Sequence, residues 1–258
     1  MPQIDLSGQT ALVTGAGEGI GLAICRQFLD AGCRVVLNDV RPEAALRAAR
    51  QLQPIGECLG VAGDVSSLSV VEDLVQRAVS EFGGLDILVA NAALTRIGSF
   101  LEFPVKDFQD TIDLNLRGSF FLAQAGARSM QQSRTRGRII LTTSVVARRV
   151  VKGLSVYAMT KAGLEMLVRF LAVELGPLGI RANAIAPGAT LTPRTRVEHP
   201  EYEGIWGAVN PAGRVAEPSD VAGAALFLAS SLSEYVNGQV LTVDGGWTAS
   251  GFVPPEVA

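Results

Sequence analysis

The sequence contains Thr14-Gly15-Ala16-Gly17-Glu18-Gly19-Ile20-Gly21, and this glycine-rich stretch decides the fold. An apolar, β-branched run at residues 10–14 leads into it, and a helical pattern at residues 20–31 follows. Glycine permits a tight turn and a close approach of the backbone to a ligand, and the N-terminus of a helix offers free N–H groups. This order of strand, turn and helix predicts a cradle for the pyrophosphate of a dinucleotide. The alternative is a flexible turn that only starts a helix.

The rest of the chain repeats the alternation of strand and helix. Apolar runs predict strands at residues 10–14, 34–37, 58–61, 86–90, 138–142, 181–185 and 240–243. Helical spacing predicts helices at residues 20–31, 42–52, 66–82, 105–132, 155–175 and 219–230. Together they predict an α/β fold, a single-domain, doubly wound parallel sheet of Rossmann type over residues 1–258 with helices on both faces. In such sheets, ligands bind outside the carboxyl ends of the strands.

Length and composition exclude several classes of protein. The 258 residues are 48% hydrophobic, which is enough apolar surface for a core and excludes a disordered chain. A formal net charge of −3 argues against a nucleic-acid binder. Cys25, Cys33 and Cys58 form no paired motif, so we expect buried free thiols and no metal site. We find no secretory signal and no apolar run of membrane length, so we expect no membrane partner and a cytoplasmic location.

The spacing of the glycines resembles that of a known family. Gly15, Gly19 and Gly21 form the pattern GxxxGxG of the short-chain dehydrogenases/reductases, and the resemblance extends from residue 6 to about residue 247. It implies an oxidoreductase that binds a nicotinamide dinucleotide. The cofactor-binding residues that we expect, in large part from this resemblance, are Gly15, Gly17, Glu18, Gly19, Ile20, Gly21, Asp39, Asp64, Val65, Asn91, Tyr157, Lys161, Pro187, Gly188, Thr190 and Thr192.

Two acidic residues predict which dinucleotide is used. Asp39 follows the second strand, where a carboxylate accepts hydrogen bonds from the hydroxyls of the adenosine ribose and repels a 2′-phosphate. Glu18 adds a second carboxylate in the phosphate loop, so we expect NAD as the cofactor. Arg41 argues the other way, because a basic residue just after this strand can favour NADP, and we weigh it below the two acids.

Ser144, Tyr157 and Lys161 are the predicted catalytic residues. Tyr157 and Lys161 are four residues apart and therefore share one face of a helix, and Ser144 follows the fifth strand. A nearby ammonium lowers the pKa of a phenol, which can then exchange a proton with an alcohol or a carbonyl while hydride is transferred. Ser144 can hydrogen-bond the same oxygen. Asn115 is the fourth catalytic candidate, because the family's matching asparagine bends its helix and holds a water that relays protons to the lysine.

The chain departs from the family pattern after the fourth strand. It reads Ala90-Asn91-Ala92-Ala93 where the family usually has Asn-Asn-Ala-Gly. Alanine tolerates a positive φ poorly, so the turn at Ala93 could differ. We still expect Asn91 to support the cofactor or the central sheet.

The sequence says least about the substrate. Residues 190–214 show little regular pattern and follow the Pro187-Gly188 turn, so we expect them to form a lid over the substrate. His199 is expected at the surface or against the substrate. Arginines that could surround the pocket mouth are Arg96, Arg148, Arg149, Arg194 and Arg196, and solvated loop arginines are the alternative for each. An acidic substrate is therefore a minor hypothesis, and the main prediction is an NAD-dependent enzyme that interconverts a secondary alcohol, such as a polyol or sugar, and its ketone or lactone.

Two alternative functions remain open at this point. A carbonyl reductase resembling 3-oxoacyl-[acyl-carrier-protein] reductase usually uses NADPH, and Asp39 and Glu18 argue against it. A non-catalytic module that senses nucleotides typically lacks the tyrosine or the lysine, whereas this chain keeps both Tyr157 and Lys161.

The two longest predicted helices suggest an oligomer. Apolar residues such as Phe120 and Phe121 in the first, and Met166 and Phe170 in the second, surround much of each helix. A helix that is apolar on most sides needs a cover besides the sheet. We therefore expect a homotetramer with two-fold symmetric contacts, and the family resemblance agrees.

Overall fold

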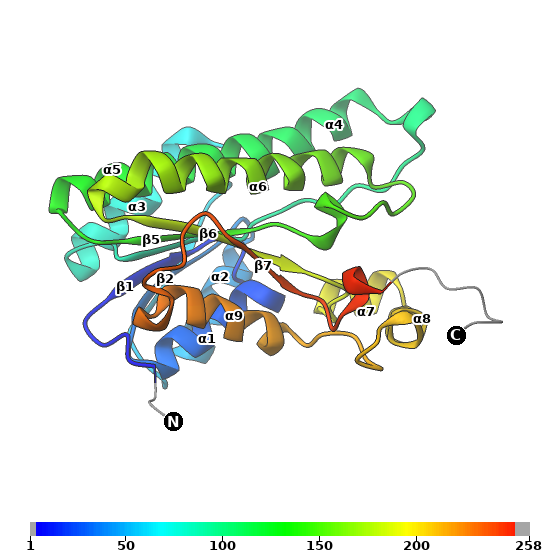
Figure 1. Cartoon of the computed structure of the whole chain (residues 1–258). Helices are drawn as coiled ribbons and strands as arrows, with labels where there is room; N and C mark the ends of the chain where they lie inside the picture. The colour runs from blue at the N-terminus through cyan, green and yellow to red at the C-terminus, as the bar shows by residue number, and fades with distance from the viewer. Residues whose placement is uncertain (1–3, 251–258) are drawn as a thin grey trace.

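The core of the fold is a sheet of seven parallel strands (Figure 1), which the computed structural model describes within residues 4–250. The strands are β1 (Thr10–Val13), β2 (Arg34–Asp39), β3 (Cys58–Ala62), β4 (Ile87–Ala90), β5 (Arg138–Thr142), β6 (Arg181–Pro187) and β7 (Val240–Val243). Their order is β3-β2-β1-β4-β5-β6-β7. Since β1 pairs with both β2 and β4, the winding reverses beside β1, and such a reversal is where open α/β sheets bind ligands. The predicted doubly wound sheet is confirmed.

Helices cover both faces of the sheet, as Figure 1 shows. One face packs against α1 (Gly19–Asp30), α2 (Pro42–Leu52) and α9 (Pro218–Ala229), and the other against α3 (Leu68–Phe82), α5 (Ser119–Ser133) and α6 (Ser155–Leu175). Successive strand residues alternate between the two cores: Val13 lies in the first and Leu12 in the second. Because each strand is buried on both faces, its sequence is a continuous apolar run. Cys25, Cys33 and Cys58 are buried free thiols, as predicted.

The predicted helix at residues 105–132 contains a wider turn in its middle. α4 (Val105–Ile112) leads into a π-helical segment, Asp113–Gly118, which leads directly into α5. Such a turn places the buried side chain of Asn115 against the backbone of Leu94, with which it forms two hydrogen bonds. The predicted helical stretch is therefore confirmed, and the bend that the family resemblance implies at Asn115 takes the form of this π turn.

The segment at residues 190–214, whose sequence shows little regular pattern, forms two short helices, α7 (Pro193–Glu198) and α8 (Tyr202–Val209). A reciprocal cap stabilises α7. The backbone N–H of Thr195 donates to Thr192 Oγ1 at 3.2 Å, and the N–H of Thr192 donates to Thr195 Oγ1 at 2.8 Å. Pro193 occupies the first turn, where its missing N–H costs nothing. The sequence does not predict these two helices, because helices this short show no clear periodicity.

The outer faces of α5 and α6 remain apolar in the single chain. Leu122 and Leu164 are buried toward the sheet, whereas Phe120, Met166 and Phe170 are 42%, 48% and 58% exposed. Each helix therefore has an apolar side that the sheet does not cover. Within the described residues, no helix combines the length and the apolar character that crossing a membrane requires.

Candidate active site

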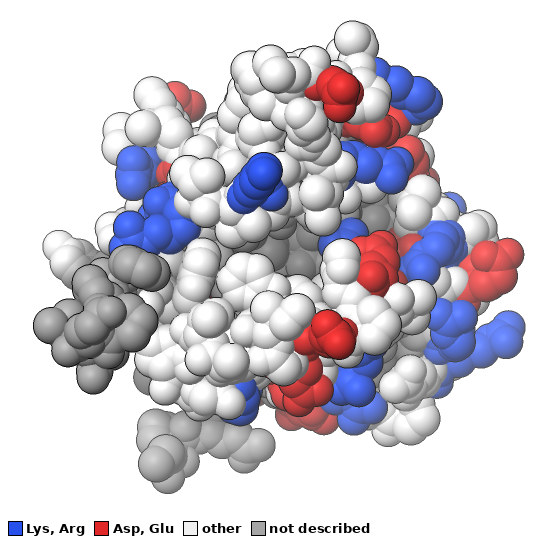
Figure 2. Space-filling view, turned by 90° about the vertical axis from the view of Figure 1, so that its right-hand side faces the viewer, with Lys and Arg blue, Asp and Glu red and all other residues white. Residues whose placement is uncertain are grey.

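The loops after β4, β5 and β6 border a cavity of about 860 Å³ at the carboxyl edge of the sheet. Figure 2 shows a hollow in this face of the molecule. Most of the residues that border it are uncharged, and a few charged side chains lie close to its opening. Of the predicted site residues, those that line the cavity are Ile20, Asn91, Ser144, Tyr157, Lys161, Pro187, Gly188, Thr190 and Thr192. The other predicted residues are not part of its lining, and they lie in the glycine-rich loop, at the ends of β2 and β3, and in the π turn.

The glycine-rich loop between β1 and α1 has no room for side chains at several positions, Gly15 and Gly21 among them. Gly15 has a φ of 61°, and a Cβ there would lie 2.7 Å from Ala92 Cα. A Cβ on Gly21 would lie 2.5 Å from the carbonyl oxygen of Gly15. Real Cβ atoms do not approach other atoms so closely, so both positions require glycine. The loop therefore presents bare backbone next to the N-terminus of α1, which is an arrangement suited to phosphate.

Asn91 ties this loop to the end of β4. Its Nδ2 donates to the carbonyl oxygens of Thr14 and Gly15, both at 3.0 Å, and its backbone N–H donates to Thr14 Oγ1 at 3.1 Å. Asn91 thus fixes the shape of the glycine-rich loop from the neighbouring strand. Ala93, which replaces the family glycine, has no positive φ, so the turn needs no glycine at that position.

Asp39, at the end of β2, is 5% exposed and faces the glycine-rich loop. Its Oδ2 accepts a hydrogen bond from the N–H of Gly17 at 3.0 Å, and its Oδ1 accepts from Arg41 Nε at 3.2 Å. Arg41 Nη2 also lies 3.3 Å from Glu18 Oε1. The hydrogen bond to Asp39 raises the pKa of Arg41, so the guanidinium stays charged and partly neutralises both acids. Arg41 is thus part of the same charge cluster as the two carboxylates.

The remaining predicted cofactor residues lie after β3 and β6. Val65 is buried, and Asp64 is exposed and accepts a hydrogen bond from the N–H of Ser66 at 2.9 Å. Gly188 lies tightly against the chain after β7, because a Cβ on it would be 2.7 Å from Asp244 Cβ. Thr192 faces the glycine-rich loop, since a Cβ on Gly19 would lie 3.4 Å from its methyl group.

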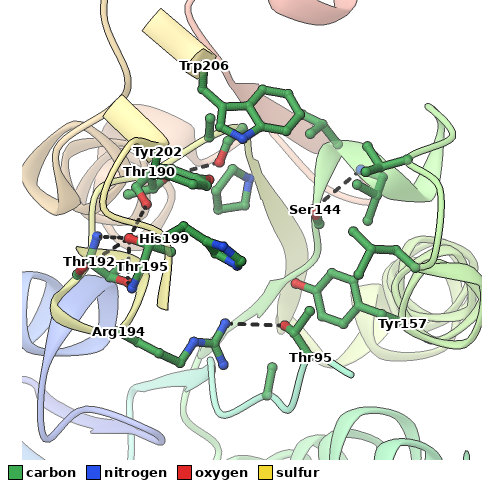
Figure 3. Close-up of a pocket in the computed structure, with 18 of the residues that line it drawn as sticks. Thr95, Ser144, Tyr157, Thr190, Thr192, Arg194, Thr195, His199, Tyr202 and Trp206 are labelled. Atoms are coloured by element: carbon green, nitrogen blue, oxygen red, sulfur yellow. Dashed lines mark hydrogen bonds between the residues drawn. The ribbon is translucent and has the colours of Figure 1, made fainter. Parts of the chain in front are cut away.

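Ser144 and Tyr157 lie on one side of the cavity (Figure 3), where their hydroxyls face the open space, and Lys161 also lines the cavity. Lys161 is 1% exposed, and its Nζ donates to the carbonyl oxygen of Thr142 at 2.7 Å and lies 5.4 Å from the centre of the Tyr157 ring. Burial lowers the pKa of Lys161 to about 7. The ammonium is therefore only partly populated at neutral pH.

The pKa of Tyr157 is raised, mainly because burial disfavours the phenolate, while hydrogen bonds with the hydroxyls of Ser144 and Thr95 lower it to a smaller extent. The expectation that Lys161 lowers the pKa of Tyr157 is wrong for the protein without ligand. The physical reason is that Lys161 is itself desolvated and bonds to Thr142.

Asn115 connects the loop after β4 to the helix that carries Tyr157 and Lys161. Its Oδ1 accepts from the N–H of Leu94 at 2.7 Å, and its Nδ2 donates to Leu94 O at 2.9 Å and to Thr160 Oγ1 at 3.2 Å. Thr160 in turn donates to the carbonyl oxygen of Tyr157 at 2.7 Å. All the polar atoms of the Asn115 side chain are thus paired, and the residue holds the two walls of the site together.

Of the five arginines expected near the pocket mouth, only Arg194 lines the cavity. Arg148 pairs with the buried Glu165 at 2.8 Å, and Arg96 lies 3.5 Å from Asp107. His199 also lines the cavity, which agrees with its expected place against the substrate.

Sequence reasoning missed Thr95 and the aromatic residues Tyr202, Trp206 and Trp247, all of which line the cavity. Thr95 follows Asn91 closely enough that its place after β4 is a usable signal. Tyr202 and Trp206 lie on α8, and Trp247, which follows β7, meets them only in the folded chain.

Comparisons with known proteins agree with this geometry. A family model described as enoyl-(acyl carrier protein) reductase matches residues 15–248. L-rhamnose 1-dehydrogenase (NAD(P)(+)) of Azotobacter vinelandii is 38% identical over 93% of this chain and 97% of its own length. 2-Dehydro-3-deoxy-D-gluconate 5-dehydrogenase of Escherichia coli is 37% identical over 95% of this chain and 97% of its own. A short-chain type dehydrogenase/reductase from Mycobacterium marinum superposes with a TM-score of 0.91 at 33% identity, covering 96% of this chain and 98% of the other. The chain therefore belongs to the short-chain dehydrogenase/reductase family of oxidoreductases.

Proposed function

We propose that this chain is a dehydrogenase that prefers NAD and interconverts a secondary alcohol, of the polyol or sugar type, and its ketone or lactone. The observation that carries the proposal is the meeting of Ser144, Tyr157 and Lys161 in one cavity beside the glycine-rich loop. Relatives that act on sugars and on sugar acids support the substrate class. We also propose a cytoplasmic location, which three unpaired buried thiols support.

The residues present fit a nicotinamide dinucleotide. A Cβ on Gly15 or Gly21 would collide with neighbouring backbone, so the loop keeps a cradle of bare backbone, and Asn91 fixes its shape. In our proposal the pyrophosphate binds at this cradle, Asp39 accepts hydrogen bonds from the adenosine ribose, and Thr192 closes the loop from the lid side. Lys161 and Tyr157 then face the nicotinamide end, because both line the cavity.

In the proposed mechanism the alcohol loses a proton from oxygen and a hydride from carbon. A nicotinamide ring, when bound, would supply the acceptor for the hydride. Ser144 holds the substrate oxygen by a hydrogen bond, and Tyr157 Oη takes its proton, or returns it in the reverse direction. Positive charge at Lys161 offsets the effect of burial on Tyr157 and favours the phenolate. Asn115 keeps the two walls in register through Leu94 and Thr160.

A turnover assay tests the proposal directly. A panel of secondary alcohols, polyols and sugars is offered with NAD⁺ and NADP⁺ in parallel, and formation of the reduced nucleotide is followed by absorbance. We expect oxidation of at least one polyol or sugar. Reduction of a 3-oxoacyl thioester with NADPH, without oxidation of any alcohol, would favour the acyl reductase instead. Binding of nucleotide without any turnover would favour the sensing module.

The charge cluster around Asp39 gives a paired prediction. Asp39→Asn keeps an acceptor for the Gly17 N–H and removes one negative charge, so the preference for NAD⁺ over NADP⁺ should narrow by roughly 10-fold or more. Arg41→Ala removes the partner of both acids and should widen the preference. The measurement is the ratio of kcat/KM for the two nucleotides. A wild type that uses NADP⁺ better would show that Arg41, and not the acids, sets the choice.

The apolar outer faces of α5 and α6 support a homotetramer. In our proposal Phe120, Met166 and Phe170 are covered by a second copy across a two-fold axis, and β7 with the chain beyond it forms another contact. Light scattering at micromolar concentration should give about four times the monomer mass of 27.1 kDa. A mass near 27.1 kDa would contradict the prediction, and twice that mass would support only the helix contact.

A further inference from the structure

Arg194 is the one arginine of the described residues that faces the site. It lies on α7, and Figure 3 shows its guanidinium reaching across the cavity toward Thr95, beside the Tyr157 hydroxyl. Its Nη2 is 3.4 Å from Thr95 Oγ1. Its charge acts on Tyr157 closely enough to lower that pKa, although burial has the larger effect. A fixed positive charge thus stands next to the oxygen that exchanges the proton.

The N–H donors of the Arg194 guanidinium have few hydrogen-bond partners among the described residues. Among the described residues its polar contacts are the long bond to Thr95 and an ion pair with Glu198, whose Oε2 lies 3.7 Å from Arg194 Nε. The two side chains of that pair are 45% and 54% exposed, and ion pairs this exposed contribute little to stability. A guanidinium has five N–H donors in a planar fork. Arg194 therefore keeps the donors that a carboxylate would bind in bidentate fashion.

The backbone beneath Arg194 is held in place. Thr192 and Thr195 cap α7 reciprocally, and Thr195 Oγ1 also donates to the carbonyl oxygen of Thr190 at 3.3 Å. These bonds tie the first turn of α7 to the end of β6. The arginine is thus presented from an anchored position, which lowers the entropy lost when a ligand binds.

Aromatic side chains form another part of the cavity lining. The ring centres of Tyr202 and Trp206 lie 6.2 Å apart, and those of Trp206 and Trp247 lie 5.6 Å apart. Such a wall packs against the C–H groups of a carbon skeleton. The cavity therefore offers an apolar surface for the body of a ligand and a cation beside the reacting centre, together with two acids at its rim, Glu198 and Glu201.

We propose that Arg194 determines specificity by binding a carboxylate of the substrate, and that the substrate is a hydroxy acid whose carboxylate lies only a few bonds from the reacting carbinol. Arg194 Nη2 lies 3.4 Å from Thr95 Oγ1, beside the Tyr157 hydroxyl (Figure 3). A carboxylate bound by Arg194 must therefore be close to the carbinol that reacts at Tyr157. The proposal rests on the proposed dehydrogenase function and adds the charge of the substrate to it. In the bound state the carboxylate replaces the weak contact with Glu198.

The chain carries its own probe for this proposal. Its two tryptophans, Trp206 and Trp247, both line the cavity, so intrinsic fluorescence reports a ligand without any turnover. We would titrate aldonates of several chain lengths, each paired with the neutral alditol of the same skeleton. At least one acid should bind roughly 10- to 100-fold more tightly than its neutral partner, as expected for charge-assisted hydrogen bonds.

Variants separate Arg194 from its surroundings. Arg194→Gln should abolish the preference for the acid, and Arg194→Lys, which keeps the charge without the fork, should retain part of it. Arg196→Gln is the matched control, because Arg196 lies on the same helix but does not line the cavity. It should leave the preference unchanged.

The outcomes distinguish this proposal from the proposed function. Equal binding of acids and alditols, or a preference that survives in Arg194→Gln, would overturn the role of Arg194. If neutral alditols are oxidised and Arg194→Gln leaves the ratio of acid affinity to alditol affinity unchanged, the role of Arg194 is overturned while the dehydrogenase function stands. Acid binding that depends on Arg194 without any oxidation would support the anion site and contradict the dehydrogenase function.

Discussion

Tyr157→Phe should lower kcat by about 100- to 10,000-fold, the range that removal of a general acid or base produces. The substitution removes only the hydroxyl, so the ring keeps its packing and its place above Lys161. Binding of NAD⁺ should stay close to that of wild type, because the nucleotide is held mainly at the glycine-rich loop and Asp39. Steady-state rates and a direct binding titration of NAD⁺ together check the expectation.

Tyr235→Phe is a matched control for that variant. Tyr235 is fully exposed and does not line the cavity, so the same change of atom there should leave turnover unaffected. If Tyr157→Phe retained more than a few per cent of wild-type activity, Tyr157 would not be the residue that exchanges the proton.

The sheet could be predicted well because its residues have few alternatives. Val35 and Val36 lie in opposite cores, so both must be apolar, and a continuous apolar run marks each buried parallel strand. The glycine-rich loop could be predicted for a similar reason, since Gly15 and Gly21 leave no space for a Cβ. Where sterics or burial restrict a position to one kind of residue, the structure at that position can be predicted from the sequence.

The π turn and the lid could not be predicted in this way. Asn115 is one polar residue in an apolar run, and only its partner Leu94, distant in the sequence, explains the extra residue in the turn. The helices of the lid are too short for periodicity to show. Their caps depend on pairs such as Thr192 and Thr195, whose geometry appears only in the folded chain.

The sequence also could not predict which of the arginine side chains near the site would point into the cavity. Arg148 and Arg194 are both long, flexible side chains in loops or short helices near the site. Arg148 is held by an ion pair of 2.8 Å with the buried Glu165, whereas Arg194 has only a longer, exposed pair of 3.7 Å with Glu198 and lines the cavity. The difference depends on a residue of α6 that is not adjacent to either arginine in the sequence.

Lys161→Met should make the protein without ligand more stable, by an amount that depends on pH. The pKa of Lys161 is about 7 in the folded protein and near its ordinary value of 10.5 in the unfolded chain. Between these values the unfolded chain binds a proton that the folded protein does not, so the free energy of unfolding of the wild type rises with pH, by up to about 1.4 kcal/mol per unit. Below pH 7 both states bind the proton and the penalty is constant.

The variant lacks this dependence, because methionine does not titrate. Urea unfolding of both proteins at pH 7.5 and pH 9.5 should therefore show the stability gap shrinking by about 2 kcal/mol at the higher pH. The lost hydrogen bond to Thr142 O changes the difference in free energy of unfolding by a constant and does not alter its pH dependence. The other titrating groups are present in both proteins, so their effects cancel in the difference. A gap of equal size at the two pH values would mean that Lys161 keeps an ordinary pKa despite its burial. The ammonium would then be fully present at neutral pH, and the site would favour the Tyr157 phenolate even before any ligand binds.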